Sequence, residues 1–165
     1  MNSNIYYIIT HTHTYKMNEF YDQELQKALD NAQHNIGYEN GLFTKNKKEI
    51  DQIKREVILD LNKNAQLGSN QLDTNIILSK LEEYQYIDEL DEFKSGSFLR
   101  WINLESNVQS LTRGAYFCSV SITENGCALI CRAGHRFFQV KMDTCIVFQK
   151  LTFQEQLLIN AITNF

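Results

Sequence analysis

The chain of 165 residues contains no proline and only seven glycines. The glycines are scattered and lie mostly at expected turns, so the sequence has neither a phosphate-binding glycine-rich loop nor a dinucleotide-binding fingerprint. A nucleophile elbow of the Gly-x-Ser-x-Gly type is missing too. We therefore expect a protein that is not an enzyme and that carries no cofactor.

Long apolar runs are also missing. The apolar stretch from Ile5 to Ile9 is too short for the apolar region of a signal peptide or for a membrane helix. Without an export signal, the four cysteines are expected to be reduced thiols inside a cell. The sequence therefore predicts an intracellular location, in the cytoplasm or, for a viral protein, in the virion or the host cytoplasm, with no membrane partner.

An excess of positive charge is missing as well, because 16 Lys and Arg stand against 20 Asp and Glu, for a net charge of −4. This balance argues against a protein that binds polyanions over its whole surface, but it does not exclude a local basic patch. Hydrophobic residues make up 43% of the chain and charged residues 22%, as in globular proteins. The lack of proline, with many Asn, Ile, Lys, Tyr and Phe residues, is typical of AT-rich genomes such as those of phages, large DNA viruses and some microbes.

What the chain does contain is a change of character at Ser95-Gly96-Ser97. Residues 1–94 hold 10 Lys and Arg against 16 Asp and Glu, whereas residues 95–165 hold 6 against 4. The second region also contains all four cysteines and the only tryptophan. We expect an acidic, mainly helical subregion over 1–94 and a β-rich subregion over 95–165, packed together as one compact unit.

The first region reads as a short strand or arm followed by three helices. Asn4 to Thr10 is β-branched and aromatic, as strands are. Apolar residues recur at helical spacing from Met17, again from Ile50 to Leu61, and again from Asp73 or Thr74 onward. The apolar side of the third helix is expected to consist of Ile77, Leu78, Leu81, Tyr84 and Ile87.

The second region changes to a period of two, which is typical of strands. Strands are expected at 98–104, 116–122, 127–132, 136–142 and 145–148. Asn125-Gly126 is a strong hairpin turn signal, and such a turn would place Val120 opposite Cys131. Thr152 and Glu155 have the spacing of a capping box, which predicts that a final helix begins there.

These elements predict an α+β fold. About three N-terminal helices are expected to pack on a five-stranded antiparallel meander or small β-barrel, with a C-terminal helix that caps it. One face of the second strand is expected to carry Tyr116, Cys118, Val120 and Ile122.

An acidic run at the end of the expected third helix is the main support for our first functional interpretation. Most such runs are solvated faces, but this one is a candidate surface for docking a basic partner. We therefore expect a non-enzymatic interaction or structural and assembly protein that acts through a protein partner or through self-association. The composition of the chain fits a viral or phage origin. The residues of this surface are Glu82, Glu83, Asp88, Glu89, Asp91 and Glu92.

Basic and aromatic residues in the β region support an alternative, a small nucleic-acid-binding barrel. Proteins that bind single strands combine aromatic platforms with cations that follow the backbone. The candidate residues are Arg100, Trp101, Arg136, Phe137 and Lys141. Alternation predicts that Phe137 and Lys141 share one face, opposite Phe138, Val140 and Met142.

The cysteines, at positions 118, 127, 131 and 145, resemble part of a zinc site only at first sight. Cys127 and Cys131 would lie roughly 13 Å apart along one strand, too far to share a zinc ion whose Zn–S bonds are about 2.3 Å. The pattern favours packing as small apolar side chains. Metal binding and redox chemistry, including a Cys–His dyad with His135, stay open as alternatives that nothing in the sequence favours.

His11 and His13 are the weak metal candidates. On a strand they project to one side, roughly 6–7 Å apart, which suits a single metal ion. Ile9 to Thr14 resembles the N-terminal His-x-His strand of the polymerase-and-histidinol-phosphatase family of metal-dependent phosphoesterases. That resemblance implies metal ligands at these two histidines. The family also needs several further His and acidic ligands from later strands, and the only other histidines of this chain are His34 and His135. The alternative is an exposed polar strand.

Overall fold

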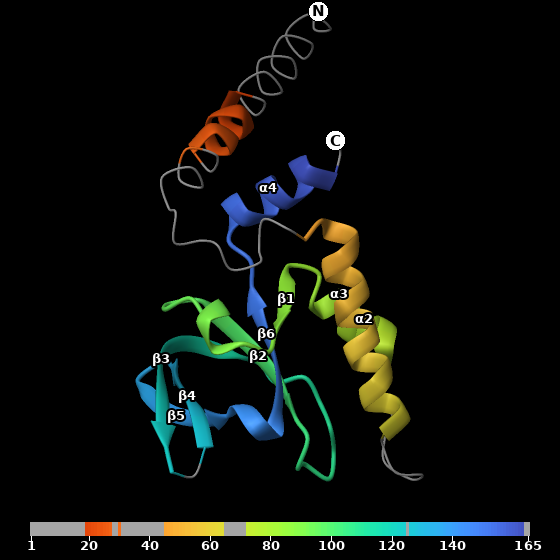
Figure 1. Cartoon of the computed structure of the whole chain (residues 1–165), viewed down its shortest axis with the longest axis vertical. Helices are drawn as coiled ribbons and strands as arrows, with labels where there is room; N and C mark the ends of the chain where they lie inside the picture. The colour runs from red at the N-terminus through yellow and green to blue at the C-terminus, as the bar shows by residue number, and fades with distance from the viewer. Residues whose placement is uncertain (1–18, 28–29, 31–44, 65–71, 125, 164–165) are drawn as a thin grey trace, which may run out of the picture.

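The computed structural model describes residues 19–27, 30, 45–64, 72–124 and 126–163 (Figure 1). A helical segment covers residues 19–27. The expected N-terminal strand, His11, His13, His34 and the polar loop at 66–70 lie outside the described residues. The elements that follow are α2 Lys47–Asn64, α3 Thr74–Lys80, β1 Tyr84–Ile87, η1 Leu90–Glu92, β2 Phe98–Asn103, β3 Ala115–Thr123, β4 Gly126–Ala133, β5 Arg136–Lys141, η2 Met142–Thr144, β6 Cys145–Lys150 and α4 Phe153–Thr163.

The strands form one six-stranded sheet in the order β1-β6-β2-β3-β4-β5, with antiparallel pairing throughout. β2 to β5 form a meander of four strands, whereas the expected fifth strand, β6, returns to lie between β1 and β2, and β1 is a sixth strand that the sequence did not predict. The α+β fold is confirmed. The sheet has two edges, β1 and β5, so it is open rather than closed into a barrel.

The sheet curls around one of its faces, which we call the concave face. The rings of Trp101 on β2 and Phe138 on β5 lie 5.9 Å apart, although two strands separate β2 from β5. In a flat sheet these strands would be roughly 14 Å apart. The curl encloses a core of Leu99, Ala115, Phe117, Leu129, Cys131, Val140 and Val147.

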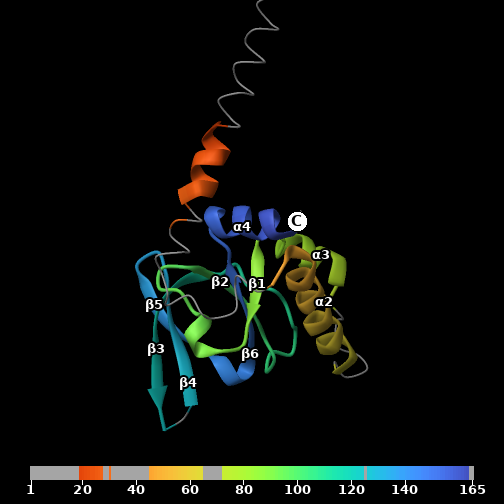
Figure 2. The ribbon, with the colours of Figure 1, turned by 45° about the horizontal axis from the view of Figure 1, so that its top comes forward.

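The opposite, convex face is covered over only part of its width. Helices α2 and α3 pack on its β1-β6-β2 part, where the core consists of Ile58, Leu61, Ile77, Leu81, Tyr84, Ile102 and Phe148. β3, β4 and β5 lie on the side of the molecule away from these two helices (Figures 1 and 2). Among the helices in the described residues, α2 and α3 therefore do not extend over the convex face of β3–β5.

The third helix is shorter than expected, because α3 ends at Lys80 and Tyr84 to Ile87 form β1 instead. The Leu81 carbonyl accepts hydrogen bonds from Lys54 Nζ at 2.8 Å and from the Tyr84 N–H at 3.0 Å. These bonds turn the chain at the helix end, and β1 then pairs with β6. The helical spacing of Ile77, Leu81 and Tyr84 was thus a misleading signal.

The β3–β4 hairpin differs from the expected register. Thr123 pairs with Gly126, so only positions 124 and 125 separate the strands, and Cys131 lies opposite Phe117 rather than Val120. The register also shifts between Phe117 and Ser119. Because of this β-bulge, the residues of β3 that face the concave core have odd numbers before it (Phe117) and even numbers after it (Val120, Ile122). The prediction that residues 116, 118, 120 and 122 share one face is therefore wrong.

The final helix begins as the sequence predicts. The Thr152 N–H donates to Glu155 Oε2 at 2.7 Å, and the Glu155 N–H donates to Thr152 Oγ1 at 3.3 Å. This reciprocal pair is a capping box. Phe153, the first residue of α4, contacts the rings of Phe20 and Tyr21, which attaches the helical segment 19–27 to this end of the molecule.

None of the helices in the described part of the chain is long and apolar enough to cross a membrane.

Candidate nucleic-acid interface

A single row of side chains crosses the convex face of the sheet from edge to edge. Tyr84 pairs with Lys150, Phe98 with Tyr116, Tyr116 with Arg132, and Arg132 with Phe137. Lys150 is one residue beyond the Leu99–Gln149 pair, which brings it beside Phe98. Directly paired residues in an antiparallel sheet project to the same face. We call these six residues the cross-strand row.

The row becomes more exposed toward β5. Tyr84 is buried, whereas the exposed fraction is 51% for Tyr116 and 64% for Phe137. Arg132 is exposed and lies between these two aromatic residues. Phe98 and Tyr116 meet edge to face, with ring centroids 5.0 Å apart. The exposed part of the row therefore alternates aromatic rings with a guanidinium group.

The next positions on the same face are small, polar or basic. Ser119, Ile130 and Gln139 form one neighbouring line, and Ser121, Ala128 and Lys141 form the next. None of the residues that the strand pairing places on this face of β3–β5 is Asp or Glu. The strand residues of this surface thus offer aromatic rings, hydroxyl and amide groups and two cations, and none of them is an acid.

Gly114 allows the start of the row to form. It adopts φ +97, and a Cβ atom there would lie 2.4 Å from the Leu99 carbonyl oxygen and 2.5 Å from Cε1 of Phe98. Both contacts are far inside van der Waals distance, so a side chain at this position would displace Phe98 or separate β2 from β3. The glycine is required by this close approach.

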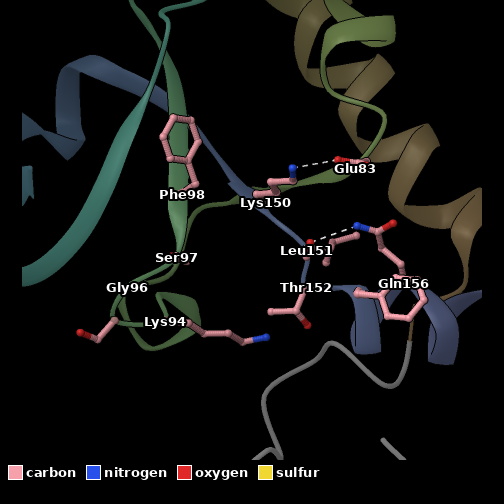
Figure 3. A pocket seen from close by; sticks show the side chains of 11 residues that line it. Glu83, Lys94, Gly96, Ser97, Phe98, Lys150, Leu151, Thr152 and Gln156 are labelled. Atoms are coloured by element: carbon pink, nitrogen blue, oxygen red, sulfur yellow. Dashed lines mark hydrogen bonds and ion pairs between the residues drawn. The ribbon is translucent and has the colours of Figure 1, made fainter. Parts of the chain in front are cut away.

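An open cavity of about 560 Å³ adjoins the Phe98 end of the row (Figure 3). The segment from Lys94 to Phe98 lies along one side, and residues 150–153 with Gln156 lie along the other. Lys150 Nζ is 3.0 Å from Glu83 Oε2, and Lys94 forms an ion pair with Glu155. The hydrogen bond and the charge of Glu83 raise the pKa of Lys150.

Gln149 holds the wall of this cavity in place from within the concave core. Its Oε1 accepts hydrogen bonds from the Lys94 N–H at 2.9 Å and from Ser97 Oγ at 2.8 Å. Its Nε2 donates to the Glu92 carbonyl at 3.1 Å. A buried amide that satisfies both ends in this way fixes the segment 92–97 against β6.

The residues predicted for nucleic-acid binding do not form one surface. Phe137 and Lys141 share the convex face, as the alternation predicts. Arg100 lies on the same side of the sheet but donates to the carbonyls of Thr112 and Lys80. Trp101 projects to the concave face, where it packs on Phe138, and Arg136 alternates with Phe137 and so projects to that side as well.

The predicted acidic surface is not the end of a helix. It comprises the turn before β1, the loop after it and η1. Glu82, Glu83, Asp88, Glu89 and Asp91 are exposed, and Glu83 pairs with Lys150. Glu92 Oε2 is buried without a hydrogen-bond partner. The six carboxylates therefore differ in how well they could contact a partner.

The cysteines and histidines do not converge. In the described part of the chain, no three His, Cys, Asp or Glu side chains could hold a metal ion, and His11 and His13 lie outside it. All four cysteines are free thiols. Cys131 is fully buried in the concave core, where burial raises its pKa to about 11. Cys118, Cys127 and Cys145 are partly exposed.

The sequence interpretation did not include Tyr116 or Phe98 in this site. The pairing predicted from Asn125-Gly126 would place Tyr116 opposite His135, whereas the observed pairing places it opposite Arg132. A prediction with the two-residue loop at positions 124 and 125 and with the bulge would have placed Tyr116 opposite Arg132. The bulge has no local sequence signal, because Cys118 is an ordinary strand residue.

Comparison with known proteins gives no match: no family model matches the chain, and neither does any curated protein or solved structure.

Proposed function

We propose that this protein binds single-stranded nucleic acid on the convex face of β3–β5. The observation that carries the proposal is the exposed part of the cross-strand row, in which Tyr116, Arg132 and Phe137 lie on adjacent strands. Large exposed aromatic residues are uncommon on a sheet that faces only water, and here they are neighbours of a cation.

The geometry of the row suits stacked bases. Tyr116 and Phe137 are two strand spacings apart, which is roughly 10 Å, so each ring can take a base while Arg132 lies between them. Stacking of a base on an aromatic side chain contributes about 1–3 kcal/mol and depends little on sequence. A guanidinium group adds stacking and cation–π contacts.

The charge distribution supports the same proposal despite the net charge of −4. Arg132, Lys141 and Lys150 project to the convex face. Glu83 pairs with Lys150 at the edge of the covered half, and no carboxylate of residues 82–91 belongs to β3–β5. With so few cations, we expect a modest affinity and a shallow salt dependence. Each phosphate contact with a single strand changes the slope of log K against log salt by roughly −0.7.

The test is fluorescence anisotropy with a labelled oligothymidylate or oligouridylate at low and moderate salt. The double variant Tyr116→Ala with Phe137→Ala is expected to bind at least about tenfold more weakly, since each lost stacking contact costs about 1–3 kcal/mol. The matched control is Ile122→Ala, which removes a side chain that is 76% exposed but lies at the hairpin tip on the other side of β3. Equal binding by the wild type and the double variant would overturn the proposal.

A second candidate function is docking of a basic protein surface, including that of another copy of this chain. The exposed carboxylates Glu82, Asp88 and Glu89 favour it, because the chain then presents an acidic segment and a basic sheet face to different directions. Reversal of these three residues to Lys should abolish association in light scattering at low salt. If association persists unchanged, the acidic segment has no part in it.

A further inference from the structure

We infer that the cavity beside Phe98 holds the next base of the bound strand, the one that follows the base on the exposed row. This inference rests on the proposed function and adds a subsite to it. The cavity and the row are continuous, because Phe98 and Lys150 belong to both.

The walls of the cavity suit a flat, partly polar ring. Phe98 and Phe153 contribute aromatic surface from β2 and α4, and Ser97 and Thr152 contribute hydroxyl groups. Its volume of about 560 Å³ is within the range of about 300–1,000 Å³ that is typical of small-molecule sites. A single nucleobase with part of its sugar is a ligand of this size class.

The charges in the cavity favour a base over a phosphate group. The ammonium group of Lys150 is held by Glu83, and that of Lys94 is held by Glu155 (Figure 3 shows the first of these pairs). A phosphate group would meet these carboxylates as well as the lysines, and like charges repel. A neutral base avoids this repulsion and can accept or donate hydrogen bonds at the wall.

The cavity also has a fixed wall before any ligand arrives. Gln149 anchors the segment 92–97 through hydrogen bonds to Lys94, Ser97 and the Glu92 carbonyl. The capping box of Thr152 and Glu155 fixes the opposite wall at the start of α4. A site that is already formed loses less conformational entropy when it binds.

A length series of oligothymidylates tests the inference. Affinity is measured for strands of three to eight nucleotides with the wild type, with Phe153→Ala and with Gln156→Trp, which fills the cavity from α4. The shortest strands, which the row alone accommodates, are expected to bind all three proteins equally. Longer strands are expected to bind both variants about tenfold more weakly than the wild type, because one stacking contact is lost.

The salt dependence provides a second readout. The slope of log K against log salt is expected to stay at the wild-type value in both cavity variants, because a base and not a phosphate occupies the site. Ile76→Ala on α3, another exposed apolar residue, is the control and should bind strands of every length as the wild type does.

Three results would contradict the inference, and they are distinguishable. If the row variants weaken binding but the cavity variants match the wild type at every length, the cavity subsite is wrong and the proposed function stands. If the wild type binds none of the strands, the proposed function and the subsite both fail. A shallower salt slope in Phe153→Ala would assign the cavity to a phosphate group instead.

Discussion

The convex face of the sheet consists of two halves that have the same backbone geometry but different surroundings. Over β1, β6 and β2 it is covered by α2 and α3, and its side chains include Tyr84, Ile102 and Phe148. Over β3, β4 and β5 these two helices do not cover it, and the cross-strand row continues with Tyr116, Arg132 and Phe137. Aromatic residues occur in both halves, so aromatic content alone does not separate core from surface.

What separates the halves is the neighbours of each aromatic ring. Phe148 lies among apolar side chains of the helices, and its neighbour Tyr86 is 6.1 Å away by ring centroids. Phe137 instead has the charged Arg132 opposite it on β4. An aromatic residue beside an exposed cation is compatible with water and with a stacked base, whereas one inside an apolar cluster stabilises the fold.

The largest expected effect breaks the covered half. Phe148→Ala should lower the free energy of unfolding by about 3–5 kcal/mol, because it removes a fully buried ring and leaves a cavity. Phe137→Ala should change it by no more than about 0.5 kcal/mol, because the ring is exposed. Urea unfolding followed by circular dichroism measures both. Severe destabilisation by Phe137→Ala would mean that this ring belongs to a core.

A second prediction concerns two successive residues of β4, Cys131 in the concave core and Arg132 on the convex face. Because burial raises the pKa of Cys131 from 9.0 to about 11, the unfolded thiol ionises first as the pH rises. The stability it supports is complete below about pH 9 and is lost as the pH approaches 11, by about 2–3 kcal/mol at most.

The measurement is the urea midpoint of the wild type and of Cys131→Ala between pH 8 and 11. Burial raises the pKa of Tyr84 and Tyr86, so these two groups also make the folded state less stable as the pH rises. Burial lowers the pKa of Lys54, which makes the folded state more stable as the pH rises. Only the difference between the two proteins reports on Cys131. A wild-type pH dependence no steeper than that of the variant would show that the thiol ionises as readily in the folded state.

A third prediction compares two arginines on the two sides of one hairpin. Arg132→Glu should weaken binding of a single strand by about tenfold or more and make its salt dependence shallower, because a cation on the convex face is replaced by an anion. Arg136→Glu changes an exposed arginine that projects to the other side, and it should have a much smaller effect. Anisotropy titrations at two salt concentrations distinguish these outcomes. Equal losses would indicate non-specific attraction to the whole β region.

The smallest effect is expected at the border between the two halves. Glu83→Gln removes the ion pair with Lys150. Both side chains of this pair are exposed, so the free energy of unfolding should change by less than about 1 kcal/mol. The freed ammonium group should increase affinity for a single strand slightly, by a factor of about two. Weaker binding by this variant would contradict the placement of Lys150 in the binding surface.

Local signals predicted several elements correctly. Helix α2 follows from the helical spacing of Ile50, Ile58 and Leu61, which are all buried. The start of α4 follows from the four-residue capping box. The alternation of β5 correctly placed Val140 in the core and Phe137 on the surface. Each of these depends on residues within one or two turns, or within one strand.

Other features could not be read from local patterns. Residues 84–87 continue a helical spacing, yet they form β1 because their partners in β6, which follow 60 to 66 residues later, supply the hydrogen bonds of a strand. Trp101 and Phe137 looked alike as aromatic neighbours of basic residues, but the curl of the sheet places Trp101 against Phe138. For this reason the sequence predicted only Phe137 and Lys141 of the proposed binding surface correctly.

The sequence by itself determined the α+β class, α2, the capped start of α4 and the two sides of β5, because periodicity and capping act between residues that are close along the chain. Only the tertiary structure decided which side chains become neighbours in the cross-strand row. The bulge at Cys118 and the register of the β3–β4 hairpin align Phe98, Tyr116, Arg132 and Phe137, and the return of β6 beside β2 adds Lys150. The physical reason is that strand pairing joins distant residues, and a shift of register by a single residue exchanges the two faces of a strand.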